Sequence, residues 1–120
     1  MNNKPYLFDD VVNTITNISM EMNELVNEMM LIDEEVDTTR HEHMMKAARA
    51  WPTLTGSIAD KERTVQIICE HESTAEMLAR RKQIAAKRRM EYLRMAFEAA
   101  RSINASKRAE FAAEPIGQFT

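Results

Sequence analysis

The sequence holds little of what tight turns and disulfide-bonded folds require. Only 2 of its 120 residues are glycine, 3 are proline and 1 is cysteine. Because β-barrels and glycine-rich phosphate loops depend on glycine and proline at their turns, this scarcity argues against both and favours helix. A single cysteine, Cys69, cannot close an intrachain disulfide, so the sequence gives no sign of an oxidising compartment.

Long hydrophobic runs are also missing. The longest apolar run has four residues, Met29 to Ile32, whereas a membrane-spanning helix needs about 20. We therefore expect no signal peptide, no membrane partner and a cytoplasmic location. Apolar residues make up 44% of the chain and charged residues 29%, which is the balance of a soluble folded domain.

The clearest positive pattern is a heptad repeat near the amino terminus. Starting at Phe8, apolar residues alternate at spacings of three and four over nine positions, which is the seam of a coiled coil. Helix-forming residues continue to about Arg49, so we predict a first helix over residues 8–49. We expect the seam to join copies of the chain in a homo-oligomer, through Val11, Ile15, Ile18, Met22, Leu25, Met29, Ile32 and Val36.

One internal break divides the chain. Residues 51–57 combine proline with glycine in the interior of the chain, and Ser57 to Asp60 has the spacing of a capping box, so a second helix is predicted to start at residue 58. Nothing interrupts it before Pro115, which predicts a helix over 58–112 and a flexible tail over 113–120. The expected fold is all-α: one domain, residues 1–120, of two long helices in an antiparallel helical hairpin or coiled coil.

The register of such a hairpin has an electrostatic consequence. A hairpin closed between residues 53 and 54 places residues 21–28 opposite roughly 79–86, which pairs acids with bases. The same register places the acids of residues 33–37 beside Glu70 and Glu72, a like-charge contact that lowers stability. Either these acids point outward, or the pairing is between chains.

Charge is divided unevenly along the chain. Residues 1–76 carry 15 acidic and 6 basic side chains, whereas residues 77–120 carry 4 acidic and 10 basic ones. Basic residues recur every seven positions in the second part, which places them in a row along a helix. Such a ridge either contacts phosphates or is neutralised by the acidic first helix. The predicted nucleic-acid-binding residues are Arg80, Arg81, Lys87, Arg88, Arg94, Arg101 and Arg108.

Several residues of types that occur in catalytic or metal-binding sites are interpreted here as ordinary surface or core residues. His41 and His43 are two apart and point to different sides of a helix, so we interpret them as surface histidines. Glu70, Glu72 and Glu76 are expected on a solvated face, and Cys69 in the core. Tyr92 and Phe97 are expected on the packed face of the second helix, and Trp51 under the bend. We predict no enzyme activity, no metal site and no cofactor.

The segment from Gly56 to Arg63, followed by a long charged helix through residues 91–94 and 98–102, resembles a family of small helical-hairpin proteins from bacteriophage recombination gene clusters. The two-helix plan also resembles the UvsY-like recombination mediators of T-even phages. The resemblance implies an oligomeric accessory factor, in the host bacterium's cytoplasm, that binds single-stranded DNA through the basic ridge and assists a recombinase or annealing protein.

Two alternatives of other classes stay open from the residues alone. The acidic first helix has eight acids and one base over residues 21–42, which fits an inhibitor or adaptor that occupies a basic groove on a host nucleic-acid enzyme. The third hypothesis is a structural coiled-coil scaffold. The sequence does not give the oligomer number, because its seam mixes β-branched residues with methionine and leucine.

Overall fold

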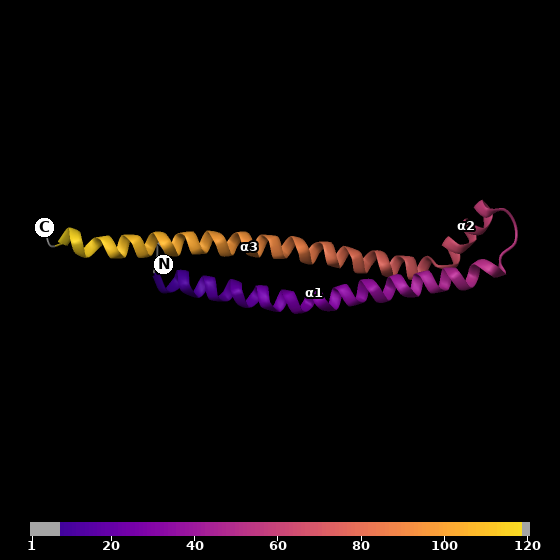
Figure 1. Cartoon of the computed structure of the whole chain (residues 1–120), viewed down its shortest axis with the longest axis horizontal. Coiled ribbons are helices and arrows are strands. Elements are labelled where there is room, and N and C mark those ends of the chain that lie inside the picture. Colours follow the sequence, from indigo (N-terminus) through magenta and orange to yellow (C-terminus); the bar gives the residue numbers. More distant parts are fainter. Residues whose placement is uncertain (1–7, 119–120) are drawn as a thin grey trace, which may run out of the picture. The chain divides into compact units, whose positions relative to one another are not determined.

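The computed structural model describes residues 8–118, and its regular structure is helical throughout that range (Figure 1). Helix α1 spans Phe8–Ala50, a short 3-10 helix spans Trp51–Thr53, α2 spans Ile58–Ile68 and α3 spans Glu70–Gln118. The described residues contain no strand, so the all-α prediction is confirmed. Their contacts divide them into two compact units, one of residues up to 26 and from 88, the other of residues 27–87.

The turn follows the signals in the sequence. Ser57 is the N-cap of α2, and its hydroxyl accepts a hydrogen bond from the backbone N–H of Asp60 at 3.2 Å. This bond satisfies one of the free donors at the start of the helix. Gly56 has φ of +112°, a conformation that residues with a side chain rarely adopt. The predicted start of a helix at Ile58 is confirmed.

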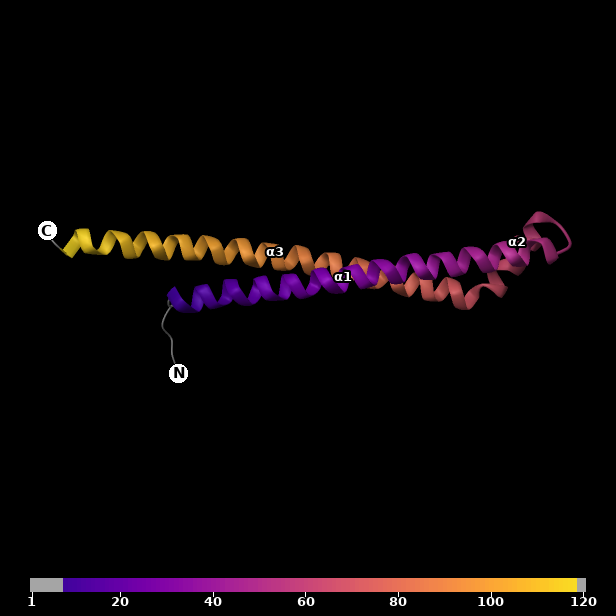
Figure 2. The same cartoon turned by 60° about the horizontal axis from the view of Figure 1, so that its bottom comes forward.

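The prediction of one continuous helix over 58–112 is wrong. Helix α2 ends at Ile68, and α3 begins at Glu70 after Cys69, whose φ and ψ are −95° and 13°. Figures 1 and 2 show α2 set at an angle to the start of α3. No glycine or proline marks this break, but the Cys69 side chain is fully buried, so packing of the thiol accompanies the change of direction.

The carboxyl-terminal boundary also differs from the prediction. The flexible tail predicted over 113–120 is helical as far as Gln118, and residues 119–120 lie outside the described residues. Proline at position 115 removes one backbone donor, and a helix continues past such a position with a local distortion.

The heptad seam of α1 is its packed face. Val11 and Leu25 are 3% and 5% exposed, while their neighbours Val12 and Val26 are 37% and 47% exposed. The other six predicted seam residues are half-buried, and the side chain of Phe8 lies outside the described part. The seam of α1 therefore packs within the chain, and its use between copies stays a prediction.

Helix α3 has a heptad seam of its own that changes character along its length. In the unit that holds α3 from residue 88 onward, the seam of α3 is largely apolar, with Met90, Leu93 and Ala100 all buried. In the other unit it includes Glu72 and Glu76, which are half-buried. The structure therefore has an apolar section of α3 and a polar one.

The polar section forms a ladder of ion pairs with α1. Lys46 Nζ lies 2.7 Å from Glu72 Oε1, and His43 Nδ1 lies 3.1 Å from Glu76 Oε1. Arg80 adds a second contact to Glu76 at 2.9 Å. The side chains of Glu72 and Glu76 are only 17% and 16% exposed. The prediction that they lie on a solvated face is therefore wrong, as is that of a simple surface histidine at His43.

These contacts replace the register predicted from the turn. A hairpin closed at residues 53 and 54 pairs position 46 with position 61, but Lys46 pairs with Glu72. The physical reason is α2: residues 58–68 form a separate helix, so the pairing of α1 begins further along the chain. The expected like-charge contact with Glu70 and Glu72 is absent among the described residues, since Glu35 pairs with Lys82 at 3.1 Å.

Replacing Leu25 tests the packed seam. We expect Leu25→Ala to lower the free energy of unfolding by about 2–4 kcal/mol, because it removes a buried side chain and leaves a cavity. The adjacent Val26→Ala is the matched control and should cost less than about 1 kcal/mol, because Val26 is nearly half exposed. Urea unfolding followed by circular dichroism measures both. Equal losses would contradict the assignment of the buried face.

The ladder predicts a loss of stability in acid. The hydrogen bond from Lys46 lowers the pKa of Glu72, and that from His43 lowers the pKa of Glu76, both from the ordinary value of 4.5. A carboxyl group with a lowered pKa stabilises the fold above its unfolded pKa and loses that contribution as pH falls through the folded pKa. Stability measured by urea unfolding should therefore fall below about pH 4.5, and Glu76→Gln should flatten this decline.

Candidate nucleic-acid interface

The cations of α3 lie on three rows along the helix. The paired edge, beside the seam, carries Lys82 and Arg89. The open edge, on the other side of the seam, carries Arg80, Lys87, Arg94, Arg101 and Arg108. The outer row, opposite the seam, carries Arg81 and Arg88. All seven predicted nucleic-acid-binding residues are exposed and lie on the open edge or the outer row.

The paired edge is neutralised by α1. Arg89 lies 3.1 Å from Glu21 in one unit, and Lys82 lies 3.1 Å from Glu35 in the other. These side chains are between 43% and 59% exposed, and ion pairs at such exposed positions contribute at most about 1 kcal/mol each. The contacts nevertheless neutralise much of the charge of these two cations.

The open edge is neutralised only in part. Arg80 pairs with Glu76, and Arg101 lies 3.9 Å from Glu98 on its own helix, at the limit of an ion pair. Lys87 and Arg94 have no acidic partner among the described residues. The facing flank of α1 explains this in the unit that holds Arg94, because every residue at its heptad position there is uncharged: Val12, Ser19 and Val26.

The two cations of the outer row have no acidic partner among the described residues. Arg81 and Arg88 are exposed, and neither makes an ion pair with a described residue. Four cations of α3 are thus left without an acid: Arg81, Lys87, Arg88 and Arg94. Of the two interpretations of the basic stretch, internal pairing holds for the paired edge, whereas Arg81, Lys87, Arg88 and Arg94 make no ion pair with a described residue.

An aromatic side chain lies beside the outer row. Tyr92 is 66% exposed, so the prediction that it belongs to the packed face is wrong: it lies one turn from Arg88, outside the seam. Phe97 is half-buried, as predicted, and the Arg101 guanidinium lies 5.8 Å from its ring. An exposed tyrosine ring beside arginine side chains provides a surface on which a nucleic-acid base can stack.

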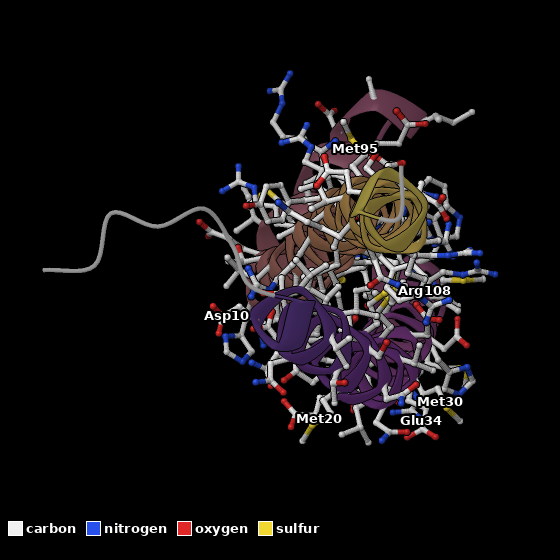
Figure 3. The ribbon with its side chains drawn as sticks, turned by 90° about the vertical axis from the view of Figure 1, so that its left-hand side faces the viewer. Asp10, Met20, Met30, Glu34, Met95 and Arg108 are labelled. Carbon is white, nitrogen blue, oxygen red and sulfur yellow. The ribbon has the colours of Figure 1, made fainter. Side chains whose placement is uncertain are left out.

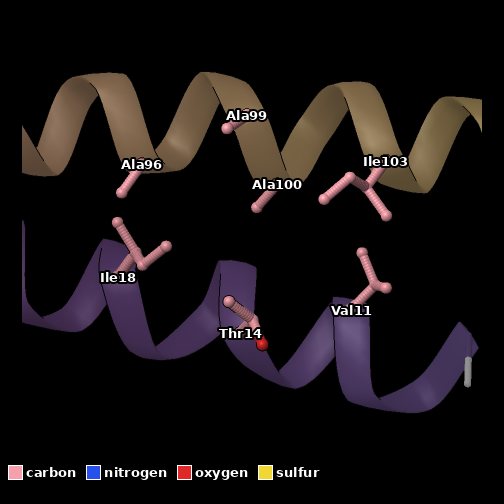
Figure 4. A pocket seen from close by; sticks show the side chains of 7 residues that line it. All are labelled: Val11, Thr14, Ile18, Ala96, Ala99, Ala100 and Ile103. Carbon is pink, nitrogen blue, oxygen red and sulfur yellow. The ribbon is translucent and has the colours of Figure 1, made fainter. Parts of the chain in front are cut away.

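Two shallow grooves lie between α1 and α3, one in each unit. The first has a volume of about 260 Å³ and is almost wholly apolar (Figure 4), lined by Val11, Thr14, Ile18, Ala96, Ala99, Ala100 and Ile103. The second, of about 520 Å³, includes charged side chains and is lined by Glu35, Ala75, Leu78, Arg81, Lys82 and Ala85. Neither places a nucleophile beside a general base, so neither offers the geometry of a catalytic site.

The other chemical candidates are not gathered into a site. Within residues 8–118 no group of three or more histidine, cysteine or acidic side chains is arranged to hold a metal ion. His41 is exposed on α1, Cys69 is buried, and the Trp51 ring is approached by Lys61 Nζ at 5.8 Å from its centre. A search of the described helices for a stretch that could cross a membrane finds none.

The outward face of α1 is acidic. Glu24, Glu28, Glu34, Asp37 and Glu42 are exposed, and the described residues provide no cation within ion-pair distance of them. Figure 3 shows Glu34 and Met30 extending away from the ribbon in one unit, and Met20 and Met95 doing so in the other. Acidic and basic surfaces therefore lie on different helices.

Comparison of the chain with protein-family models, with curated proteins and with solved structures finds no match. The candidate interface consequently stands on the geometry of α3. The sequence predicts the heptad spacing of these cations. It does not predict the exposure of Tyr92, because that exposure depends on which residues of α3 form the seam.

Proposed function

We propose that this chain is a non-enzymatic helical protein that binds single-stranded DNA along the open edge and outer row of α3. One observation carries the proposal: Lys82 and Arg89 of the paired edge have acidic partners, while Arg81, Lys87, Arg88 and Arg94 have none among the described residues. Cations repeated along one helix give it a locally positive potential. A polyanion is attracted to that potential and releases its own counterions on binding.

Single strands fit this surface better than duplex. Arginine and lysine in a row contact backbone phosphates without reading sequence. Tyr92 adds a ring on which a base can stack, and stacking requires bases that are not enclosed in a duplex. The surface is convex and belongs to one helix, so the expected binding is weak, sensitive to salt and independent of sequence.

The scaffold for this surface is proposed to be one antiparallel helical hairpin. In each unit, contacts between α1 and α3 run in opposite chain directions: Lys46 meets Glu72 in one, and Ile18 and Val11 line the groove with Ala96 and Ile103 in the other. We infer that α1 and α3 form an antiparallel helical hairpin and that hairpins associate into a homo-oligomer. The role beside a phage recombinase or annealing protein rests on the family resemblance.

Two double variants with the same net charge test the interface. Lys87→Gln with Arg94→Gln removes two cations without partners, and Lys82→Gln with Arg89→Gln removes two that already have acidic partners. Fluorescence anisotropy of labelled oligo(dT), titrated at several salt concentrations, measures both. We expect the first variant to weaken binding and to reduce the slope of log K against log salt by about 1.4, at about 0.7 per phosphate contact.

The paired-edge variant serves as the control for charge alone. Its affinity should fall less, because Lys82 and Arg89 are already compensated by Glu35 and Glu21. Equal losses from the two variants would show a diffuse charge effect and overturn the assignment to the open edge. Parent protein that leaves oligo(dT) unbound at low salt would overturn DNA binding itself.

A second candidate function has one observation in its favour. The exposed acids of α1, among them Glu24, Glu28 and Glu34, form a negative surface without partners in the described residues. Such a surface fits an inhibitor or adaptor that occupies a basic groove on a nucleic-acid enzyme. Absence of DNA binding by the parent protein would make this the leading hypothesis, ahead of a purely structural scaffold.

A further inference from the structure

The apolar groove of Figure 4 is open to solvent on the paired edge, away from the open edge. Val11 and Ile18 of α1 point toward Ala96, Ala100 and Ile103 of α3 across it (Figure 4). Ile103 is 44% exposed, and Ala99 is exposed as well. Apart from the Thr14 hydroxyl, the groove walls offer no side-chain polar group, so an apolar occupant is stabilised there and a charged one is not.

The paired edge of α3 borders the groove. Its sequence of side chains is complementary to an identical paired edge that runs in the opposite direction. At heptad spacing the paired edge reads Arg89, Ala96, Ile103 and Glu110. If this row meets an identical row running in the opposite direction, Arg89 meets Glu110 and the small Ala96 meets the larger Ile103. The ends thus match in charge and the middle matches in size, and Ala99 lies close to the centre of symmetry.

We propose that this groove binds α3 of a second copy of the chain, antiparallel, around a two-fold axis near Ala99. The contact is isologous, so each copy gives the same residues to the other and the assembly closes as a dimer. Alanine on both helices lets their backbones approach closely, and Ile103 of each copy fills the space beside Ala96 of the other. This inference rests on the oligomeric part of the proposed function and is independent of DNA binding.

Charge distinguishes α3 from α1 as the occupant. The outward flank of α1 at this level carries Asp10 and Glu24, both exposed, and placing carboxylates over an apolar groove removes them from water without a partner. Glu110 of the second copy, by contrast, arrives beside Arg89, which contacts Glu21 through one nitrogen and has further N–H donors in its guanidinium. Glu110 is well exposed, and its contact with Lys107 within the chain is long, at 3.8 Å, so it is available to a second cation.

The arrangement leaves the open edge free. Lys87 and Arg94 lie across the seam from the groove, so a dimer formed through the groove presents two open edges to solvent. The proposed contact therefore differs from one made by the seam of α1, whose residues already pack within the chain.

A pair of glutamate substitutions on one turn of α3 tests the surface. Ala99→Glu places a charge in the groove, whereas Ser102→Glu places the same charge on the outer row, and both replaced side chains are exposed. We expect the full-length parent to be a dimer by sedimentation equilibrium. Ala99→Glu should raise the dimer dissociation constant at least about tenfold, and Ser102→Glu should leave it unchanged.

Charge exchange tests the direction of the contact. Glu110→Arg should weaken the dimer by placing two cations together, and Arg89→Glu combined with Glu110→Arg should restore much of the affinity. Ala99→Cys should form a disulfide between copies under a mild oxidant, because residues near the two-fold axis come within disulfide reach. Ser102→Cys should not form one, and native Cys69 is buried.

The outcomes separate this inference from the proposals it accompanies. A monomeric parent overturns both the groove contact and the oligomer. An oligomer that responds equally to Ala99→Glu and Ser102→Glu, or that cross-links equally from positions 99 and 102, overturns the groove contact alone. Binding of oligo(dT) by Ala99→Glu, measured on the same preparation, reports DNA binding independently of the dimer.

Discussion

The structure depends on one limitation of two-helix packing: a helix that contacts a single neighbour covers only a narrow strip of its surface. Few side chains of this chain are buried, and those are confined to seams, such as Leu25 on α1 and Leu93 on α3. Most seam residues stay half-exposed. Stability then relies on every seam contact and on the edges beside it, which is why ion pairs, grooves and exposed apolar residues all lie along the same lines.

The two edges of α3 beside the seam differ in their charge and in their contacts with α1. On one side of the seam, acids of α1 compensate Lys82 and Arg89, and the row then becomes apolar at Ala96 and Ile103. On the other side, α1 offers uncharged residues such as Val12 and Val26, and Lys87 and Arg94 of α3 make no ion pair with a described residue. A single helix can in this way present one surface suited to another helix and a second suited to a polyanion, because the two surfaces are separated by the seam.

The sequence predicted the helical class, the face of α1 and the start of α2, since each depends on local signals: the spacing of apolar residues and the Ser57 cap. Predictions from the sequence were wrong where the structure depends on contacts between residues far apart in the chain. The break at Cys69 has no glycine or proline to mark it, and the register followed from the break. Once Glu72 and Glu76 were assigned to the wrong face, their partners Lys46 and His43 could not be recognised. The cations of the candidate site were found from their heptad spacing, but their pairing was not, because it requires knowing which edge of α3 faces the acids of α1.

The change of the seam from polar to apolar makes different parts of the molecule sensitive to different solvent conditions. Contacts such as Lys46 with Glu72 are electrostatic and weaken as salt screens them, whereas the packing of Leu93 and Ala100 is hydrophobic and weakens on cooling. Cold, dilute buffer therefore favours the part of the helix pair near α2, and warm, concentrated salt favours the part near residue 100. Amide hydrogen exchange along α3 should therefore be slower at the end near α2 in cold, dilute buffer, and slower near residue 100 in warm, concentrated salt.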